Sequence, residues 1–415
     1  MNGTIKMDRS KNALLPIIAA TILTEGVTIL KNVPRISDID NLLKILISMN
    51  IRPSYKNGDL YIDTRDIEYN TVNPEIAGKI RGSIFVLGAI LGRFGRATVP
   101  YPGGCAIGSR PIDLHLQGLR DLGVNVTERN ELIECTDKST ARDRVVYLDF
   151  PSVGATENLI MASVRGRSRV KITGCAREPE VEDLCNFLVA CGAKICGIGT
   201  DTIIIHGVKS LSAVTYTAIP DRINTGSYLI AVAACGGSVT ITDAEPKHNA
   251  NLISKLKKMG CEITTTADTI SITAVRRPRA LGTVHTAPYT GFPTDLQSQL
   301  CALCAVSRGV TAVTENLFEN RFKFVPELTK LGARFCVGTK SVTVSGVRAL
   351  NASFDEDAPV NLYAADLRGG VAIVIAALTA NGKSVVHNAE YIYRGHAAIE
   401  RDLAGLGANI IRIDE

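Results

Sequence analysis

The chain has 415 residues, enough for two large or three average domains with a sizeable core. Hydrophobic residues make up 46% and charged residues 21%, with a formal net charge of only +5, which excludes a disordered chain and a strongly basic nucleic-acid scaffold. Aromatic residues are 5% with no Trp, too few for platforms that stack unpaired bases, so we expect an anionic small molecule and no nucleic acid as partner.

The cysteines and the start of the chain predict a cytoplasmic protein. The eleven cysteines are odd in number and irregularly spaced, which is typical of reduced thiols. Residues 1–12 contain four charges before any apolar run, so no signal peptide is expected. The longest stretch without charge, Ile223 to Thr242, contains glycines and hydroxyls, and we expect a core helix and a strand there with no membrane span.

Six internal repeats are visible along the chain. At intervals of 69 to 73 residues, a glycine separates a helical pattern from a β-rich run: Gly26, Gly95, Gly166, Gly237, Gly309 and Gly382. A second marker, typical of a helix C-cap, ends another helical pattern in each repeat: Asn50, Gly123, Gly192, Gly260, Gly332 and Gly407. Two short strands should follow each second marker. Each repeat therefore predicts helix, strand, helix, strand, strand.

Individual elements follow from local patterns. In the first repeat, Ser37 is expected to cap the second helix, whose apolar face is Ile39, Leu42, Leu43, Leu46 and Ile47. In the third, strands are expected at Lys194 to Ile198 and Thr202 to His206. First helices such as Leu229 to Ala234 and Val371 to Leu378 are apolar all round, which places them inside a domain.

Repeats of this size are too large for a solenoid. We therefore expect an α/β fold of two inside-out domains, with three repeats each, helices inside and sheets outside. The first domain is expected at residues 11–220 and the second at residues 1–10 plus 221–415, with the chain crossing near Ala218 to Arg222. The active site is expected in the cleft between them.

Basic residues recur where the helices should begin. Four precede first helices: Lys11, Arg81, Arg222 and Arg368. Six precede second helices: Arg35, Arg110, Arg177, Lys247, Arg321 and Arg394. Cations oppose the helix macrodipole there, so an anion bound between them is one explanation, and solvated loop ends are the other.

Two residues break this pattern. Ser152 and Asp295 occupy the position that is cationic in the four other first helices. Both are explained by ordinary N-capping. Asp295 has a second interpretation, as a general base kept ionised by neighbouring guanidinium groups.

The second repeat has the longest insert, Pro100 to Arg110, before a helix that should begin at Pro111. Its glycines predict a mobile lid that carries Cys105, and a nearby Arg would lower the pKa of this thiol.

Other cysteines stand among apolar neighbours and should be inert: Cys175, Cys185, Cys191, Cys235, Cys261 and Cys336. Cys301 and Cys304 form a CxxC inside an apolar run without a second pair, so we expect buried thiols and no metal. Motifs for a P-loop, a nucleophile elbow or a zinc site are missing.

Several segments together closely resemble one family, UDP-N-acetylglucosamine 1-carboxyvinyltransferase. They are Ser10 to Pro16, Pro102 to His115, Ser152 to Thr156, Arg177 to Glu180, Phe292 to Asp295, Phe318 to Arg321, Asp366 to Arg368, and Arg394 with Gly395. The resemblance runs from about residue 4 to residue 413. The loop with Cys105 distinguishes this family from its relative, 3-phosphoshikimate 1-carboxyvinyltransferase.

The resemblance implies an inside-out α/β barrel of two domains that closes over phosphoenolpyruvate and UDP-N-acetylglucosamine, in the first committed step of peptidoglycan synthesis. It assigns Lys11 and Asn12 to phosphoenolpyruvate. Positions that it assigns to the sugar nucleotide are Arg81, Arg110, Pro111, Ile112, Asp113, Leu114, Ser152, Val153, Asp295 and Leu317. Those that it assigns to phosphate and carboxylate, or to locking the closed state, are Arg321, Arg368 and Arg394.

The implied catalytic residues are Cys105, Asp295, Lys11 and Arg394. Cys105 supplies the proton that makes the donor electrophilic, and Asp295 takes the proton of the attacking sugar hydroxyl. The cations stabilise the donor and the phosphate that leaves. This chemistry requires no metal, no organic cofactor and no oligomer.

Two positions depart from the family pattern: Phe150 stands where some members carry Lys, and Asn224 where many have Glu. They motivate one alternative, a non-catalytic paralogue that binds sugar nucleotide. A second alternative is the shikimate-pathway enzyme, against which the Cys105 loop and the run Arg110 to Leu114 argue. A third is an RNA-end-processing enzyme of similar repeat type, which the low aromatic content and small net charge disfavour.

Overall fold

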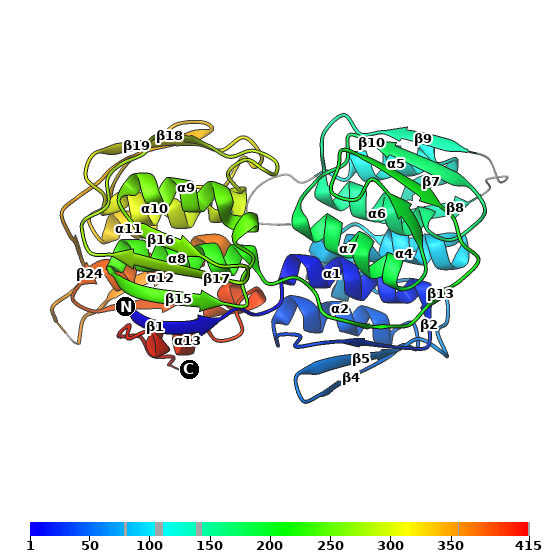
Figure 1. Cartoon of the computed structure of the whole chain (residues 1–415), viewed down its shortest axis with the longest axis horizontal. Helices are drawn as coiled ribbons and strands as arrows, with labels where there is room; N and C mark the ends of the chain where they lie inside the picture. Colours follow the sequence, from blue (N-terminus) through cyan, green and yellow to red (C-terminus); the bar gives the residue numbers. More distant parts are fainter. Residues whose placement is uncertain (79–80, 104–110, 138–142, 356, 414–415) are drawn as a thin grey trace. The chain divides into compact units, whose positions relative to one another are not determined.

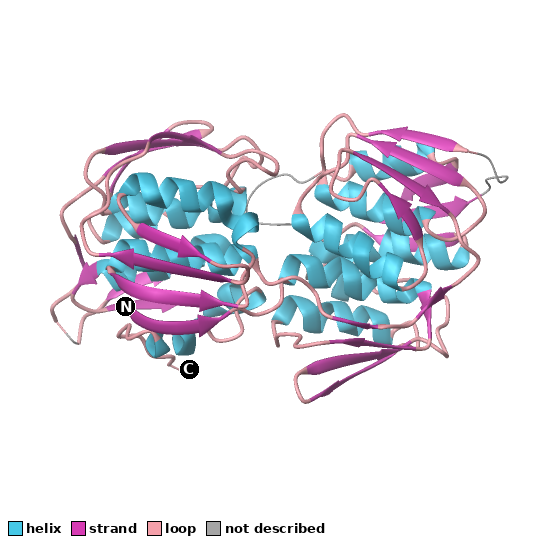
Figure 2. Ribbon diagram, viewed as in Figure 1, coloured by secondary structure: helices cyan, strands magenta, loops and turns pink. Residues whose placement is uncertain are grey.

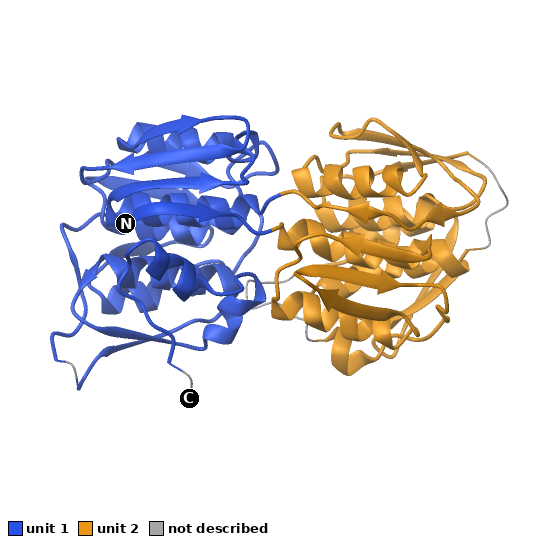
Figure 3. Ribbon diagram, turned by 60° about the horizontal axis from the view of Figure 1, so that its bottom comes forward, with its two compact units in different colours: residues 1–8, 105–109, 220–415 blue, residues 9–104, 110–219 orange. Residues whose placement is uncertain are grey.

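The computed structural model describes residues 1–78, 81–103, 111–137, 143–355 and 357–413 (Figure 1). Two sequence-predicted site residues, Cys105 and Arg110, lie outside this part. The described residues form two compact units (Figure 3). Unit 1 contains residues 1–8 and 220–413, and unit 2 contains residues 9–103 and 111–219.

The helices of unit 2 follow the predicted repeats. The first helices are α1 (Lys11–Ala20), α4 (Phe85–Phe94) and α6 (Val153–Ser163), and the second are α2 (Ser37–Ile47), α5 (Asp113–Asp121) and α7 (Pro179–Ala190). Short elements are η1 (Thr21–Leu23), α3 (Pro74–Ala77) and η2 (Arg81–Ile84). A Cβ on Gly88 would lie 2.3 Å from the backbone oxygen of Asn158, so α4 and α6 approach each other as closely as only glycine allows.

Small sheets flank these helices in unit 2. The first has the order β14 (Thr215–Tyr216), β3 (Val27–Leu30), β5 (Asp59–Asp63), β4 (Arg52–Lys56). The second has the order β6 (Arg96–Pro100), β8 (Leu132–Asp137), β7 (Val124–Arg129). The third has the order β11 (Lys194–Cys196), β12 (Thr202–His206), β10 (Arg169–Thr173), β9 (Arg144–Tyr147), and β13 (Leu211–Ser212) pairs with β2 (Thr24–Glu25). In the third sheet, Ile172 faces Ile203 across the antiparallel pair and Val146 across the parallel one, and all three are buried.

Unit 1 repeats this plan. Its first helices are α8 (Arg222–Cys235), α10 (Gln297–Ala305) and α12 (Leu367–Thr379), and its second are α9 (Ala250–Met259), α11 (Val325–Lys330) and α13 (Ile399–Gly405). The 3-10 helices η3 (Pro246–Asn249) and η4 (Thr294–Leu296) lie directly before α9 and α10, and η5 (Ala389–Arg394) lies before α13.

The strands of unit 1 form two four-stranded sheets and two pairs. One sheet has the order β1 (Asn2–Lys6), β15 (Gly237–Thr242), β17 (Thr269–Ala274), β16 (Glu262–Thr265). Another has the order β18 (Gly282–His285), β19 (Val310–Thr314), β21 (Ser341–Ser345), β20 (Arg334–Val337). Two pairs complete the unit: β22 (Leu350–Asn351) with β24 (Ala380–Asn381), and β23 (Val360–Tyr363) with β25 (Ser384–His387).

The predicted fold class is confirmed: within each unit the helices lie inside and the sheets outside (Figure 2). Residues 223–233 of α8 are all buried, as expected for a helix that is apolar all round. All six second markers have a positive φ, from 60° at Asn50 to 106° at Gly192, which is the backbone conformation that ends a helix. Among the described residues, no helix is both long and apolar enough to cross a membrane.

Several predicted boundaries are wrong. Ser37 is the first residue of α2 rather than its cap, because Ile36 before it keeps extended backbone angles. The strand predicted at Lys194 to Ile198 ends at Cys196, where Gly197 begins the turn with a φ of 79°. The helix expected from Pro111 begins at Asp113, because Ile112 has non-helical angles of −110° and 13°.

The sixth repeat also differs from the prediction. No strand follows Gly407 in the described part of the chain, where about six residues remain, near the length of one average strand. In this repeat, β23, which precedes α12, pairs with β25, which follows it. The N-terminal strand β1 pairs in parallel with β15 of the fourth repeat, with Ile5 beside Ile241.

Candidate active site

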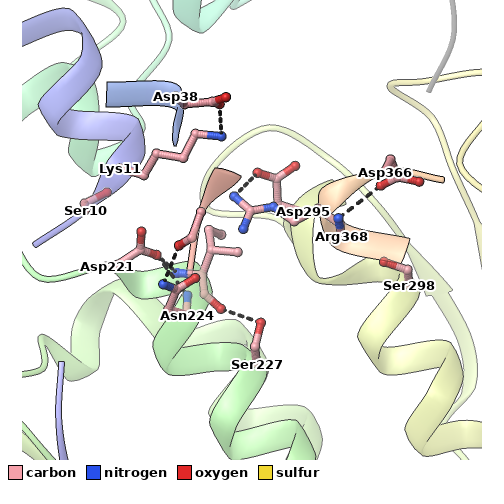
Figure 4. Close-up of polar contacts among 12 residues, drawn as sticks. Ser10, Lys11, Asp38, Asp221, Asn224, Ser227, Asp295, Ser298, Asp366 and Arg368 are labelled. Atoms are coloured by element: carbon pink, nitrogen blue, oxygen red, sulfur yellow. Dashed lines mark hydrogen bonds and ion pairs between the residues drawn. The ribbon is translucent and has the colours of Figure 1, made fainter. Parts of the chain in front are cut away.

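Asp295 lies in η4, directly before α10, and contacts two arginines of unit 1: Arg321 from the same repeat and Arg368 from the next one. Its Oδ1 accepts a hydrogen bond from Arg321 Nη2 at 2.6 Å. Its Oδ2 accepts one from Arg368 Nη2 at 2.9 Å, and Figure 4 shows Asp295 and Arg368 together. The side chain of Asp295 is 24% exposed, whereas those of Arg321 and Arg368 are 4% and 5% exposed. A partly accessible carboxylate is therefore held between two buried cations.

The local structure around Asp295 tests the first of its two interpretations, the N-cap. Pro293 and Leu296 precede η4 and α10, and neither helix has a side-chain cap, so the N-cap interpretation of Asp295 is wrong. Burial alone would raise the pKa of Asp295, but the guanidinium groups of Arg368 and Arg321 outweigh it and hold the pKa well below its usual range. The carboxylate is thus ionised at neutral pH, as the second interpretation requires.

The two arginines are positioned by their own local structure. Arg368 lies in the first turn of α12, where Asp366 caps the helix by accepting from the backbone N–H groups of Arg368 and Gly369, each at 3.0 Å. The guanidinium carbon of Arg321 lies 5.0 Å from the centroid of the Phe318 ring. The buried Nε–H of Arg321 has no hydrogen-bond partner among the described residues.

Glu315 holds the segments on either side of this cluster, and the sequence analysis missed it. Glu315 is buried, with only 1% of the residue exposed. Its Oε1 accepts from the Thr286 hydroxyl at 3.0 Å and from the N–H groups of Leu317 and Phe318 at 2.9 and 3.2 Å, and its Oε2 accepts from the Thr294 hydroxyl at 2.9 Å. The signal in the sequence was an acidic residue directly after a predicted strand, two residues before Leu317.

In unit 2, Lys11 begins α1, which Ser10 caps through a bond from Ala13 N–H to its hydroxyl. Lys11 Nζ lies 2.7 Å from Oδ2 of Asp38 in the first turn of α2, and both side chains are nearly buried (Figure 4). The charge of Lys11 therefore has a carboxylate partner within its own unit. Asn12 is the next residue of α1.

The remaining predicted site residues mostly stand at helix starts. Ser152 caps α6 by accepting from Ala155 N–H at 3.4 Å, so the N-cap interpretation is confirmed for it, and Val153 is the first residue of that helix. The others are distributed as follows: Arg81 begins η2, Pro111 and Ile112 precede α5, Asp113 and Leu114 begin it, and Arg394 ends η5. Leu317 is half-buried beside Glu315.

Asn224, one of the two departures from the family pattern, lies against the segment of Arg394. Its Nδ2 donates to the backbone oxygen of Gly395 at 3.0 Å, and the residue is 6% exposed. Its Oδ1 has no hydrogen-bond partner within the described residues. Phe150, the other departure, is 45% exposed.

Most of the cysteine predictions hold. Burial raises the pKa of Cys175, Cys235 and Cys261 to about 11 and that of Cys191 to about 12. Cys301 and Cys304 are buried as predicted, and burial raises the pKa of both thiols. Cys336 is exposed on β20, so the prediction that it is shielded by apolar neighbours is wrong: it lies on an outward sheet, not in the helical core.

Comparison with known proteins places the chain among enolpyruvyl transferases. The family model described as EPSP synthase (3-phosphoshikimate 1-carboxyvinyltransferase) matches residues 1–403. UDP-N-acetylglucosamine 1-carboxyvinyltransferase 2 of Caldanaerobacter subterraneus subsp. tengcongensis is 44% identical over 99% of this chain and 97% of its own length. The enzyme named UDP-N-acetylglucosamine 1-carboxyvinyltransferase in Dichelobacter nodosus is 41% identical over 100% of this chain and 97% of its own. The chain belongs to the UDP-N-acetylglucosamine 1-carboxyvinyltransferase family.

The family resemblance seen in the sequence is thereby confirmed. Among solved structures, the enolpyruvyl transferase NikO from Streptomyces tendae superposes with a TM-score of 0.86 at 24% identity, covering 99% of this chain and 96% of that one. EPSP synthase from Acinetobacter baumannii superposes with a TM-score of 0.73 at 16% identity, covering 99% and 96%. At these identities the two structures establish the shared fold of the family.

Proposed function

We propose that the protein transfers the enolpyruvyl group of phosphoenolpyruvate to the 3′-hydroxyl of UDP-N-acetylglucosamine, with release of phosphate. This is the first committed step of peptidoglycan synthesis, and we place it in the cytoplasm. The observation that carries the proposal is the Asp295 carboxylate, kept ionised by the buried guanidinium groups of Arg321 and Arg368. Such a cluster combines a proton acceptor with cations suited to a carboxylate or a phosphate. Relatives of near-identical length carry the same activity in their names.

In the proposed mechanism, Cys105 delivers a proton to the methylene carbon of phosphoenolpyruvate. The neighbouring carbon becomes electrophilic, the sugar hydroxyl attacks it, and Asp295 accepts the hydroxyl proton. The product of this addition is a tetrahedral ketal that still carries phosphate. Loss of a proton from the new methyl group then expels the phosphate and restores the double bond.

The cations bind the donor and stabilise the phosphate as it leaves. We assign this role to Arg321, Arg368 and Arg394 of unit 1 and to Lys11 of unit 2, with Asn12 beside it. We assign the sugar nucleotide to Leu317 and Asp295, and to residues at or near helix starts of unit 2: Arg81, Pro111, Ile112, Asp113, Leu114, Ser152 and Val153. We also assign it to Arg110, which lies outside the described residues. The positive end of the helix macrodipole suits a diphosphate, which supports the assignment at the start of α6.

A phosphate-release assay tests the proposal. Phosphoenolpyruvate should release phosphate with UDP-N-acetylglucosamine and not with shikimate 3-phosphate. Equal turnover with both acceptors would contradict the assigned acceptor. Binding of UDP-N-acetylglucosamine without any release of phosphate would instead favour a non-catalytic paralogue.

A further inference from the structure

The proposed base and the proposed donor need the same two guanidinium groups. Arg321 and Arg368 each give an Nη2 donor to a different oxygen of Asp295. While both bonds are present, the carboxylate is a weak base, because its pKa is held well below the usual range by these two cations. While both bonds are present, the Nη2 groups of Arg321 and Arg368 also point at Asp295 and not at a bound anion.

Arg321 is the arginine whose bonding is incomplete. The Nε–H and one Nη–H of a guanidinium group form a fork that matches the two oxygens of a carboxylate or phosphate. In Arg321, Nη2 donates to Asp295, whereas the buried Nε–H has no hydrogen-bond partner among the described residues. A buried donor without a partner is unfavourable, so an anion that takes both positions of the fork gains a bond that Asp295 does not make.

We propose that the anionic donor displaces Asp295 from the guanidinium group of Arg321 and thereby converts Asp295 into an effective base. This inference rests on the proposed function and adds a coupling between two of its groups. Donor binding and proton acceptance are then linked steps: Asp295 becomes a strong acceptor only when the molecule that the sugar hydroxyl must attack is present. The hydroxyl is not deprotonated ahead of its reaction partner.

Thermodynamic linkage makes this coupling measurable from either side. The factor by which the bound donor strengthens the affinity of Asp295 for a proton equals the factor by which neutralising Asp295 strengthens the affinity for the donor. A substitution that removes the charge of Asp295 should therefore improve donor binding while it impairs turnover. If Asp295 served only as a catalytic base, removing its charge would not improve the binding of the donor.

Titration calorimetry with phosphoenolpyruvate alone provides the test, using the full-length protein, Asp295→Asn and the control Asp366→Asn. Asp366 is a comparable control because it is 7% exposed and adjacent to Arg368, but its carboxylate accepts from backbone N–H groups and Asn caps a helix nearly as well. We expect the dissociation constant to fall about tenfold in Asp295→Asn, within the usual range of coupling energies, and to change less than about threefold in Asp366→Asn. An unchanged or weaker affinity in Asp295→Asn, or equal tightening in both variants, would overturn the coupling.

A second variant keeps Asp295 in place. Arg321→Lys retains a cation that pairs with the carboxylate but lacks the fork, so the dissociation constant for phosphoenolpyruvate should rise about tenfold. An unchanged constant would overturn the assignment to Arg321. Failure of the proposed function is distinguishable: in that case phosphoenolpyruvate binds neither the wild type nor any variant.

Discussion

At the scale of single residues, Asp295 shows what the spacing of residues in the sequence can predict and what it cannot. Its place at a predicted helix start suits an N-cap and a general base equally, because an Asp carboxylate can serve in either role. The choice depends on Arg321 and Arg368, which are 26 and 73 residues away and approach only after folding. The sequence therefore predicted the residue and both of its possible roles, and the folded structure excluded one.

We expect Asp295→Asn to lose at least about a hundredfold in turnover, because general-base assistance contributes roughly 10² to 10⁴ in rate. Asn keeps one acceptor oxygen but no charge, so the two buried guanidinium groups repel each other and the melting temperature should fall. Steady-state phosphate release and thermal melting measure the two effects. Asp366→Asn should stay within about threefold of wild-type turnover, since Asn supports the same cap. Turnover near the wild-type rate in Asp295→Asn would show that the base is another group.

Cys105 lies outside the described residues, and its reactivity stays a prediction from the sequence. It stands in a polar glycine loop five residues before Arg110, whereas burial raises the pKa of thiols such as Cys175 and Cys261. We therefore expect the phosphonate epoxide fosfomycin, an anionic electrophile, to alkylate Cys105 alone, as located by peptide mass spectrometry. Exposed Cys196 and Cys336 are internal controls, and adducts on them would show that exposure, not environment, determines the reaction.

At the scale of secondary-structure elements, the repeats were predictable and the connections between them were not. Glycine and asparagine markers at regular intervals indicate where helices end, because those positions need a positive φ. The pairing of β1 with β15 joins residues more than 230 positions apart, and no local pattern reports it. Glu315 was missed for the same reason, since Thr286, Thr294 and the turn at Leu317 meet only in the fold.

Glu315 positions the start of α10 and the segment after β19, so its loss should affect catalysis. In Glu315→Gln one end of the carboxylate becomes an NH₂ group, which cannot accept from Thr294 or Leu317. We expect turnover to fall about tenfold or more, because small displacements of reacting groups are costly, with little change in KM for the sugar nucleotide. Asp183→Asn is a matched control in unit 2, where a buried carboxylate accepts from Tyr216 and Ile219. A similar loss of turnover in both variants would reduce Glu315 to a general stabilising role.

Asp183 also makes stability depend on pH. Burial raises its pKa from 3.8 to about 6, despite the hydrogen bonds from Tyr216 and Ile219. Between about pH 4 and 6 the folded state then binds more protons than the unfolded state, so this group makes the protein less stable as the pH rises through that window. The loss is on the order of 3 kcal/mol at most. Urea unfolding at pH 4 and pH 7 should show a smaller loss in Asp183→Asn than in the wild type, and an equal loss would contradict the shift.

At the scale of the whole molecule, the described part of the chain passes between the two units at residues 8–9 and 219–220. The two passing segments are bonded to each other within both units. In unit 1 the N–H of Asp221 donates to the backbone oxygen of Asp8 at 2.9 Å, and in unit 2 that of Ser10 donates to Ile219 at 2.8 Å. Helices α1 and α8 begin directly after these segments, at Lys11 and Arg222. A ligand bound near Lys11 therefore acts within a few residues of the connection.

The proposed function assigns the donor to Lys11 of unit 2 and Arg394 of unit 1, so a bound anion should hold the two units together. The attraction of each cation for the anion adds to that of the other only when both are engaged. We expect the radius of gyration from small-angle X-ray scattering to fall when UDP-N-acetylglucosamine and fosfomycin are added together. Arg394→Ala should compact less at the same ligand concentrations, whereas Arg401→Ala, which removes a cation that is 77% exposed on α13, should compact like the wild type. Full compaction in Arg394→Ala, or none in the wild type, would contradict a donor held by both units.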